Sequence, residues 1–188
     1  MTSKLADTDH PIHPLLSARW SPRSFADKPV SEKAIVSLFE AVRWSPSANN
    51  LQPWSFIYGA RGSERFSLLS DCLKETNAVW AMKAPVLILA LEQPTKPDGT
   101  PHPHARYDLG QAVAHMTFQA TALGLYSHQM AGFDAERANG LLNVPSTLTP
   151  VTMIAVGYLG DPSALSPELQ NREMSPRTRK KILEFVMP

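Results

Sequence analysis

The sequence predicts an α+β fold in which helices surround a sheet of about four or five strands. Helical and strand-like segments both occur, but they do not alternate as regular strand–helix–strand units, which argues against a doubly wound sheet. Residues 85–91 form a continuous apolar run with the length of a strand buried on both faces. A core can form within one domain of residues 1–188, because 43% of the chain is hydrophobic.

The first half of the chain has a clear order of elements. Ser31 is a candidate N-cap, and the residues after it repeat apolar side chains at the spacing of a helix. Large residues alternate in a strand-like way after Pro53. The expected helices cover residues 14–18, 30–44 and 63–82, and the expected strands cover residues 54–58 and 85–91.

In the second half, a Pro-rich stretch at 93–104 predicts a long surface loop. It precedes the strongest helical pattern, residues 107–123, whose apolar stripe is rich in small residues and ends at Gly124. Further expectations are strands at 126–130 and 150–157, a short helix at 134–141, an irregular arm at 160–176, and a basic, then amphipathic, segment at 175–186.

Composition narrows the function classes. The 18 basic and 17 acidic residues leave a net charge of +1, so the sequence predicts no general affinity for nucleic acid or a membrane surface. Residues 1–13 lack the apolar region of a signal peptide, and no apolar run is long enough to span a bilayer. The expected location is the cytoplasm. The one cysteine, Cys72, is expected to be a small buried residue.

An anion must therefore be bound by a local cluster. Arg19, Ser21 and Arg23 alternate, so in an extended backbone their side chains share a side. Guanidinium groups match the geometry of phosphate, although a solvated basic loop is the alternative interpretation. The basic run at residues 177–181 supports an anion site only if it folds back on this first segment.

A second polar segment, residues 45–54, connects a predicted helix to a strand. Its Asn50 amide can donate and accept hydrogen bonds at once, as recognition of an imide edge requires. Other common sites are missing from the sequence: it contains no Gly-rich dinucleotide motif, no P-loop and no Gly-x-Ser-x-Gly elbow. The histidine pairs at 10/13 and 102/104 lack partners at zinc spacing, so no metal site is expected.

These motifs together resemble the nitroreductase family of flavoproteins. The similarity runs from Arg19-x-Ser21-x-Arg23, through Ser45-Pro46-Ser47-x-x-Asn50-x-Gln52-Pro53-Trp54 and residues 120–133, to Arg177-x-Arg179-Lys180. The resemblance implies a three-layer sandwich with a mostly antiparallel sheet, and a homodimer with two FMN molecules at its interface. It also implies that the C-terminal arm, about residues 160–188, wraps the partner subunit.

The resemblance assigns candidate cofactor-binding residues. Arg177 and Arg179 would complete a phosphate clamp, while one loop would reach the FMN of the other subunit. The full set is Arg19, Trp20, Ser21, Arg23, Pro46, Ser47, Ala48, Asn50, Gln52, Asn77, Gln129, Met130, Ala131, Gly132, Arg177 and Arg179. Trp20, Ala48 and Ala131 depart from residues common in the family, so contacts there depend on the backbone.

The implied activity is an NAD(P)H-dependent reduction through flavin N5, with nitroaromatics, quinones or related small molecules as acceptors. The cofactor supplies the chemistry, so no catalytic side chain is predicted. The alternatives are a flavin-binding or sensing protein without efficient turnover, and a specialised reductive dehalogenase or enone reductase. The short chain also implies an open acceptor site, bordered by the loop at residues 93–104.

Overall fold

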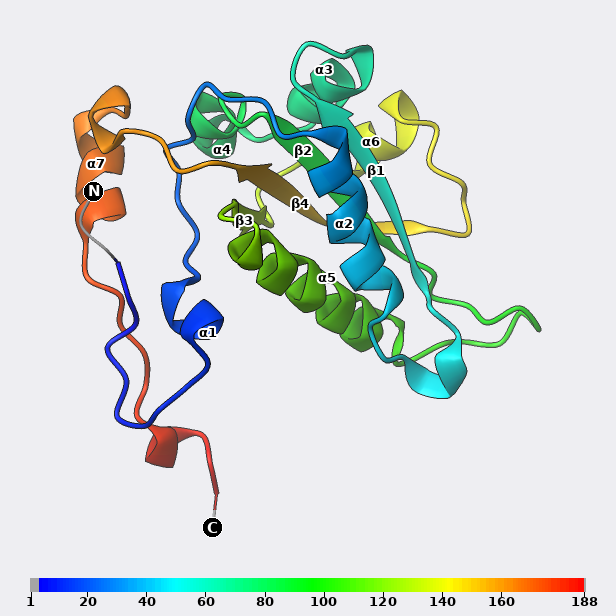
Figure 1. Ribbon diagram of the computed structural model, residues 1–188. Coiled ribbons are helices and arrows are strands. Elements are labelled where there is room, and N and C mark those ends of the chain that lie inside the picture. The colour runs from blue at the N-terminus through cyan, green and yellow to red at the C-terminus, as the bar shows by residue number, and fades with distance from the viewer. Residues whose placement is uncertain (1–3, 188) are drawn as a thin grey trace.

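The computed structural model describes residues 4–187 and contains a four-stranded antiparallel sheet at its centre (Figure 1). The strand order is β1-β2-β4-β3, and every neighbouring pair is antiparallel. The bounds are β1 (Trp54–Ala60), β2 (Val86–Glu92), β3 (Tyr126–Met130) and β4 (Thr149–Gly157). The α+β class and the antiparallel sheet predicted from the sequence are confirmed.

Helices cover both faces of this sheet and produce three layers. On one face lie α2 (Glu32–Arg43) and α5 (Ala105–Ala122); on the other lie α3 (Glu64–Asp71), α4 (Glu75–Ala81) and α6 (Ala135–Leu141). Successive side chains of β2 enter the two cores alternately: Ile88 packs on the α2/α5 side and Leu87 on the opposite side. The apolar run therefore forms a strand buried on both faces, as the sequence predicts.

Helix α5 is the scaffold on which much of the site is built. Its buried face includes Ala112 and Ala120, whose small side chains let α2 and the sheet approach closely. Gly124 ends the helix with φ = 70°, a conformation that glycine adopts without steric cost. The opposing helix α2 starts at Ser31, whose hydroxyl accepts the N–H of Ala34 at 3.3 Å, which confirms the predicted N-cap.

The single helix predicted at residues 63–82 is wrong, because the chain forms two helices, α3 and α4, with a break at residues 72–74. Backbone groups at the break bond to the segment that follows β3 instead of continuing the helical ladder. The Cys72 carbonyl accepts the N–H of Asp134 at 2.8 Å, and the Lys74 N–H donates to the Gly132 carbonyl at 3.1 Å. This exchange brings the start of α4 against the end of β3.

The arm predicted as irregular at residues 160–176 contains a helix, α7 (Pro167–Met174), so that expectation is also wrong. Ser166 caps the helix, and proline at its first position suits a helix start. The remaining elements are short: α1 (Pro14–Ala18) and three 3₁₀ turns, η1 (Ala48–Asn50), η2 (Pro162–Ala164) and η3 (Ile182–Glu184).

The two ends of the described chain run side by side, away from the sheet (Figure 1). Lys181 Nζ contacts Asp9 Oδ2 at 2.9 Å, and Arg177 donates to the carbonyls of Lys4 and Ser17 at 2.9 and 2.6 Å. The basic run therefore folds back on the N-terminal region. Within residues 4–187 no helix has both the length and the apolar character needed to cross a membrane.

Replacing Leu87 by alanine should test the two-sided packing of β2. Leu87 is fully buried, so Leu87→Ala should lower the free energy of unfolding by about 2–5 kcal/mol in urea denaturation. Val36→Ala on the solvent side of α2 is the control, expected to change it by less than about 0.5 kcal/mol. Equal effects of the two substitutions would contradict this packing.

Candidate functional site

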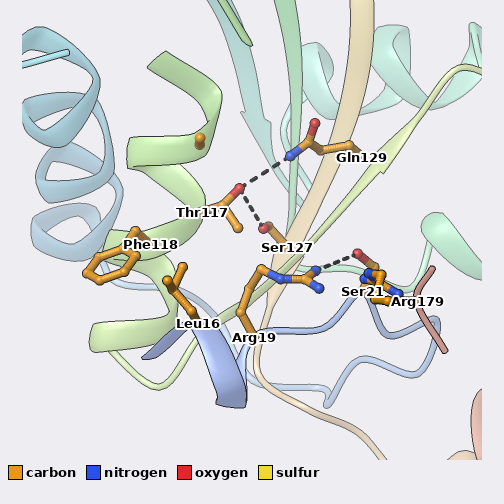
Figure 2. Close-up of a pocket in the computed structure, with 9 residues that line it drawn as sticks. Leu16, Arg19, Ser21, Thr117, Phe118, Ser127, Gln129 and Arg179 are labelled. Atoms are coloured by element: carbon orange, nitrogen blue, oxygen red, sulfur yellow. Dashed lines mark hydrogen bonds between the residues drawn. The ribbon is translucent and has the colours of Figure 1, made fainter. Parts of the chain in front are cut away.

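A cavity of about 390 Å³ lies between α5, β3, the end of α1 and the C-terminal arm (Figure 2). One wall is cationic, one is formed by amide and hydroxyl groups, and one is apolar. The lining residues are Leu16, Arg19, Ser21, Ala114, Thr117, Phe118, Ser127, Gln129 and Arg179. Arg179 and the Arg19–Ser21 segment, separated by nearly the whole chain, thus meet at one cavity.

The cationic wall carries charges that the protein does not neutralise. Burial, and then the neighbouring guanidinium groups of Arg177 and Arg179, lower the pKa of Arg19 from its ordinary value. Burial and the charge of Arg179 also lower the pKa of Arg177. Among the ion pairs of residues 4–187, none includes these three arginines. Since arginine stays protonated in proteins, this cluster favours a bound anion.

Within the cluster, the two C-terminal arginines have different surroundings. Arg177 is engaged by the backbone carbonyls of Lys4 and Ser17, so it ties the arm to the N-terminal segment beside the cavity. Arg179 lines the cavity itself and donates to the adjacent Thr178 carbonyl at 2.6 Å. Arg19 donates to Ser21 Oγ at 3.3 Å, which links the guanidinium to the hydroxyl on the same wall.

A partly buried histidine and a buried carboxylate hold the backbone of the arginine segment. The His128 ring Nδ1 lies 2.9 Å from the Pro22 carbonyl, and burial lowers the pKa of His128 to about 4, so the neutral ring donates this bond. The Glu173 carboxylate, 1% exposed, accepts the N–H groups of Arg23 and Ser24 at 2.9–3.1 Å. The α7 helix thereby fixes the segment that carries Arg19 and Ser21.

Arg23 departs from the expectation that all three alternating side chains share a side. Arg23 is absent from the cavity lining. Its positive charge instead contributes to the lowered pKa values of His128 and Lys4. The backbone bonds at Pro22 and Arg23 set this direction. Trp20 also lies outside the lining. Its ring packs edge-on against Tyr126 with 6.0 Å between the ring centroids, and the Lys4 ammonium lies over the Trp20 ring, 4.6 Å from its centroid.

The polar wall contains a residue that the sequence analysis did not select. The Thr117 hydroxyl oxygen on α5 accepts the side-chain N–H of Gln129 at 3.4 Å and the O–H of Ser127 at 3.3 Å (Figure 2). Thr117 is buried in the apolar face of α5. A polar residue on an apolar helix face was the one feature of the sequence that could have indicated a role for Thr117 beyond packing. It presents Gln129, a predicted site residue, to the cavity.

The other predicted residues of this region lie at the end of β3. The Asn77 amide donates to the Gly132 carbonyl at 3.1 Å, and a side chain on Gly132 would meet Asn77 Nδ2 at 2.5 Å. Met130 is buried in the core on the far side of the sheet, so its backbone, not its side chain, is available to a ligand. Ala131 is exposed.

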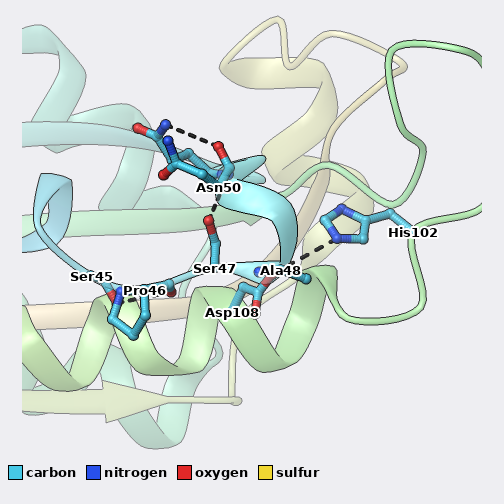
Figure 3. A network of polar contacts seen from close by, with 8 residues as sticks. Ser45, Pro46, Ser47, Ala48, Asn50, His102 and Asp108 are labelled. Carbon is cyan, nitrogen blue, oxygen red and sulfur yellow. Dashed lines mark hydrogen bonds and ion pairs between the residues drawn. The ribbon is translucent and has the colours of Figure 1, made fainter.

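The loop at residues 45–52 lies elsewhere, beside the first turn of α5 (Figure 3). The cavity uses residues 114–118 of that helix, so about 9–15 Å of helix, at about 1.5 Å per residue, separates Asp108, which contacts the loop, from the lining residues. Within one chain the two predicted binding segments are not brought together. The loop exposes Pro46, Asn50 and Gln52, while Ser47 and Ala48 are half-buried.

The Pro-rich segment at residues 93–104 differs from a simple surface loop. Thr95 and Pro101 form a β-bridge, and the His102 ring is buried 3.8 Å from the carboxylate of Asp108. Across residues 4–187, no group of three or more His, Cys, Asp or Glu side chains has an arrangement suited to a metal ion.

Comparison with known proteins identifies the family. The model of the nitroreductase family matches residues 16–158, which is well over half of the chain. The protein therefore belongs to the nitroreductase family. An uncharacterized 15.4 kDa protein of Mycolicibacterium smegmatis is 35% identical over 132 residues, covering 66% of this chain and 88% of that protein. A candidate NADH dehydrogenase/NAD(P)H nitroreductase of Xanthomonas oryzae pv. oryzae is 27% identical, covering 77% of this chain and 82% of its own.

Solved structures agree with this assignment. A crystal structure of an oxidoreductase containing FMN matches with a TM-score of 0.93 and 31% identity, covering 100% of this chain and 96% of its own. A nitroreductase candidate from Desulfovibrio desulfuricans, in complex with FMN, matches with a TM-score of 0.72 and 25% identity. The match covers 95% of this chain and 98% of that chain. The expected three-layer architecture is thus confirmed by relatives as well as by the sheet.

The partly buried His128 predicts a pH dependence of stability. Its folded pKa of about 4 lies below the ordinary 6.5, so between these values the unfolded chain binds a proton that the folded chain does not. Folding stability should therefore fall as the pH drops from 6.5 to 4, with His128 accounting for up to about 3 kcal/mol.

His128→Gln keeps an N–H donor for Pro22 but removes this titration, so its unfolding free energy, measured in urea, should fall less steeply over that range. A constant difference between wild type and variant from pH 6.5 to 4 would contradict a neutral His128 in the folded protein.

Proposed function

We propose that this protein is an FMN-dependent oxidoreductase that moves a hydride from NAD(P)H, through flavin N5, to nitroaromatics, quinones or related small acceptors. The observation that carries the proposal is the unneutralised arginine cluster at one end of a cavity whose wall also holds amide and hydroxyl groups. A phosphate on one end and a polar heterocycle on the other fit that arrangement. Relatives that contain FMN, or are named for NAD(P)H, support it.

The residues fit the flavin in distinct roles. Arg19 and Arg179 bind the phosphate, with Arg177 adding positive charge behind them, and Ser21 contributes a hydroxyl. Gln129, held by Thr117, and the backbone at residues 130–132 face the ring, with Asn77 at its pyrimidine edge. Trp20 and Arg23 support the arginine segment through packing and backbone bonds.

FMN, when bound, accepts and passes on the hydride, so the protein contributes binding, orientation and charge. The net positive charge of the arginine segment would also favour the negative charge that develops on the ring on reduction. NAD(P)H and then the acceptor would bind in turn at the same face of the flavin, which would give a ping-pong cycle.

The proposed assembly is a homodimer in which each FMN is contacted by both subunits. Pro46, Ser47, Ala48, Asn50 and Gln52 then reach the flavin of the partner, since they lie far from the cavity of their own chain. Exposed apolar side chains support such an interface: Leu183 and Met187 of the arm are each 90% exposed, and Phe185 is 64% exposed. The arm, about residues 160–188, packs on the partner in this arrangement.

The purified protein should be yellow and show the absorption bands of oxidised flavin, with FMN in the supernatant after heat release. Rapid NAD(P)H oxidation with a quinone or nitroaromatic acceptor should follow. A colourless protein that FMN does not change on gel filtration would contradict the proposal. Flavin binding without NAD(P)H oxidation would instead indicate a sensing role.

Arg19→Ala should weaken FMN binding by about tenfold to about a hundredfold, because it removes a charge-assisted hydrogen bond of about 1.5–3 kcal/mol from the phosphate. Gln52→Ala is the comparison, since Gln52 is exposed and its amide bonds only the Asn50 carbonyl of its own loop. Fluorescence titration of the apoprotein with FMN measures both. Equal dissociation constants for the two variants would overturn the phosphate assignment.

A further inference from the structure

Asp108 places a buried carboxylate beneath the loop at residues 46–52 (Figure 3). Its side chain is only 3% exposed, and Oδ2 accepts the backbone N–H of Ala48 at 3.0 Å. Hydrogen bonds to ionised acceptors are stronger than neutral ones, and a buried carboxylate without partners is costly. Asp108 therefore fixes the backbone of Ala48 to the rigid helix α5.

The loop needs such an anchor because its backbone is unusual. Asn49, Asn50 and Gln52 have φ angles of 52°, 55° and 49°, in the left-handed region that residues other than glycine rarely occupy. Asparagine tolerates this conformation, but glutamine has no such preference. Conformations of this kind persist when surrounding contacts over-determine them.

Those contacts come from only two sources in the described structure. Inside the loop, the Gln52 N–H donates to Ser47 Oγ at 3.0 Å, and the Asn50 N–H donates to the Ser47 carbonyl at 3.0 Å. Among the described hydrogen bonds of residues 46–52, two reach a helix or strand: the Trp54 N–H at the start of the adjoining strand β1 donates to the Gln52 carbonyl at 2.8 Å, and the Ala48 N–H donates to Asp108 on the distant helix α5. Asp108 is therefore the contact that fixes the stretch between Ser47 and Asn50 to α5.

His102 brings a second loop to the same carboxylate. Its Nε2 lies 3.8 Å from Asp108 Oδ2, and this buried atom has no hydrogen-bond partner within residues 4–187. The backbone N–H of His102 donates to the Pro94 carbonyl at 2.8 Å, which ties this residue to the start of the Pro-rich segment at residues 93–104. The carboxylate thus sits between two loops and contacts both of them.

We propose that Asp108 is a positioning residue for flavin binding: it holds the Ala48 backbone so that Ser47 and Asn50 face the FMN of the partner subunit. This inference rests on the proposed function. Asp108 is not a cofactor ligand in this arrangement, and its effect on the loop passes through the Ala48 N–H. Its substitution should therefore damage the site that contains the loop of the substituted subunit, and not the site that contains its arginines.

Three variants separate positioning from general destabilisation. Asp108→Ala should weaken FMN binding by about tenfold in fluorescence titration, while Asp108→Asn, which keeps an oxygen acceptor, should remain within about twofold of wild type. Leu87→Ala is the control: it lowers the melting temperature through the core but leaves FMN affinity unchanged. Equal FMN affinity of Asp108→Ala and wild type would overturn the inference.

Ala48→Pro removes the donor of the same hydrogen bond instead of its acceptor. It provides the test if the Asp108→Ala protein does not fold. It removes the donated N–H at the first position of η1, where proline is tolerated, and Ser47 before it is already extended with φ = −150°. It should reproduce the affinity loss of about tenfold. An Ala48→Pro protein that binds FMN like wild type would overturn the inference.

Mixed dimers give the decisive readout. In a dimer of one Asp108→Ala subunit and one Arg19→Ala subunit, one site combines both defects, whereas the other combines an intact loop with intact arginines. Titration with FMN should then find one site of wild-type affinity per dimer. A mixed dimer without a wild-type site would overturn the inference. Wild-type protein that does not bind FMN would overturn the proposed function together with it.

Discussion

Three guanidinium groups that lie close together, with no ion-pair partner within residues 4–187, are the constraint around which the ends of this chain are organised. Like charges at short range repel, and burial adds to the cost, as the lowered pKa values of Arg19 and Arg177 indicate. The arrangement persists because other groups hold it. Arg177 donates to two carbonyls of the N-terminal region, and the Lys181–Asp9 ion pair aligns the arm with it.

Two buried carboxylates perform similar tasks at the two polar segments. Glu173 accepts the backbone N–H groups of Arg23 and Ser24, and Asp108 accepts that of Ala48. In both cases the acid bonds to the backbone and leaves neighbouring side chains free to meet a ligand. A rigid helix thus supports each segment, which suits binding groups that must be oriented before the ligand arrives.

Local sequence patterns were enough to predict most of the fold. Ser31 and the apolar spacing after it indicate α2, and the apolar run around Ile88 indicates a central strand. The return of Arg179 to the Arg19 segment could be stated only as a condition, because sequence spacing does not show which distant segments meet. The structure supplies that contact.

The missed features all depend on partners far away in the sequence. Helix α3 ends because the backbone near Cys72 bonds to residues about 60 positions later, which no helical period reveals. Asp108 reads as an ordinary acid in the first turn of a helix, and Glu173 lies in an arm without a strong apolar pattern. Their roles follow from burial and from backbone donors that only the folded chain brings near.

The most direct test of the central claim compares FMN with riboflavin, which carries the same ring and ribityl chain but no phosphate. If the arginine cluster binds phosphate, two charge-assisted contacts of about 1.5–3 kcal/mol each should make FMN bind the apoprotein at least about a hundredfold more tightly. The difference should shrink as salt is added. Equal dissociation constants for FMN and riboflavin at low salt would contradict this account of the arginine cluster.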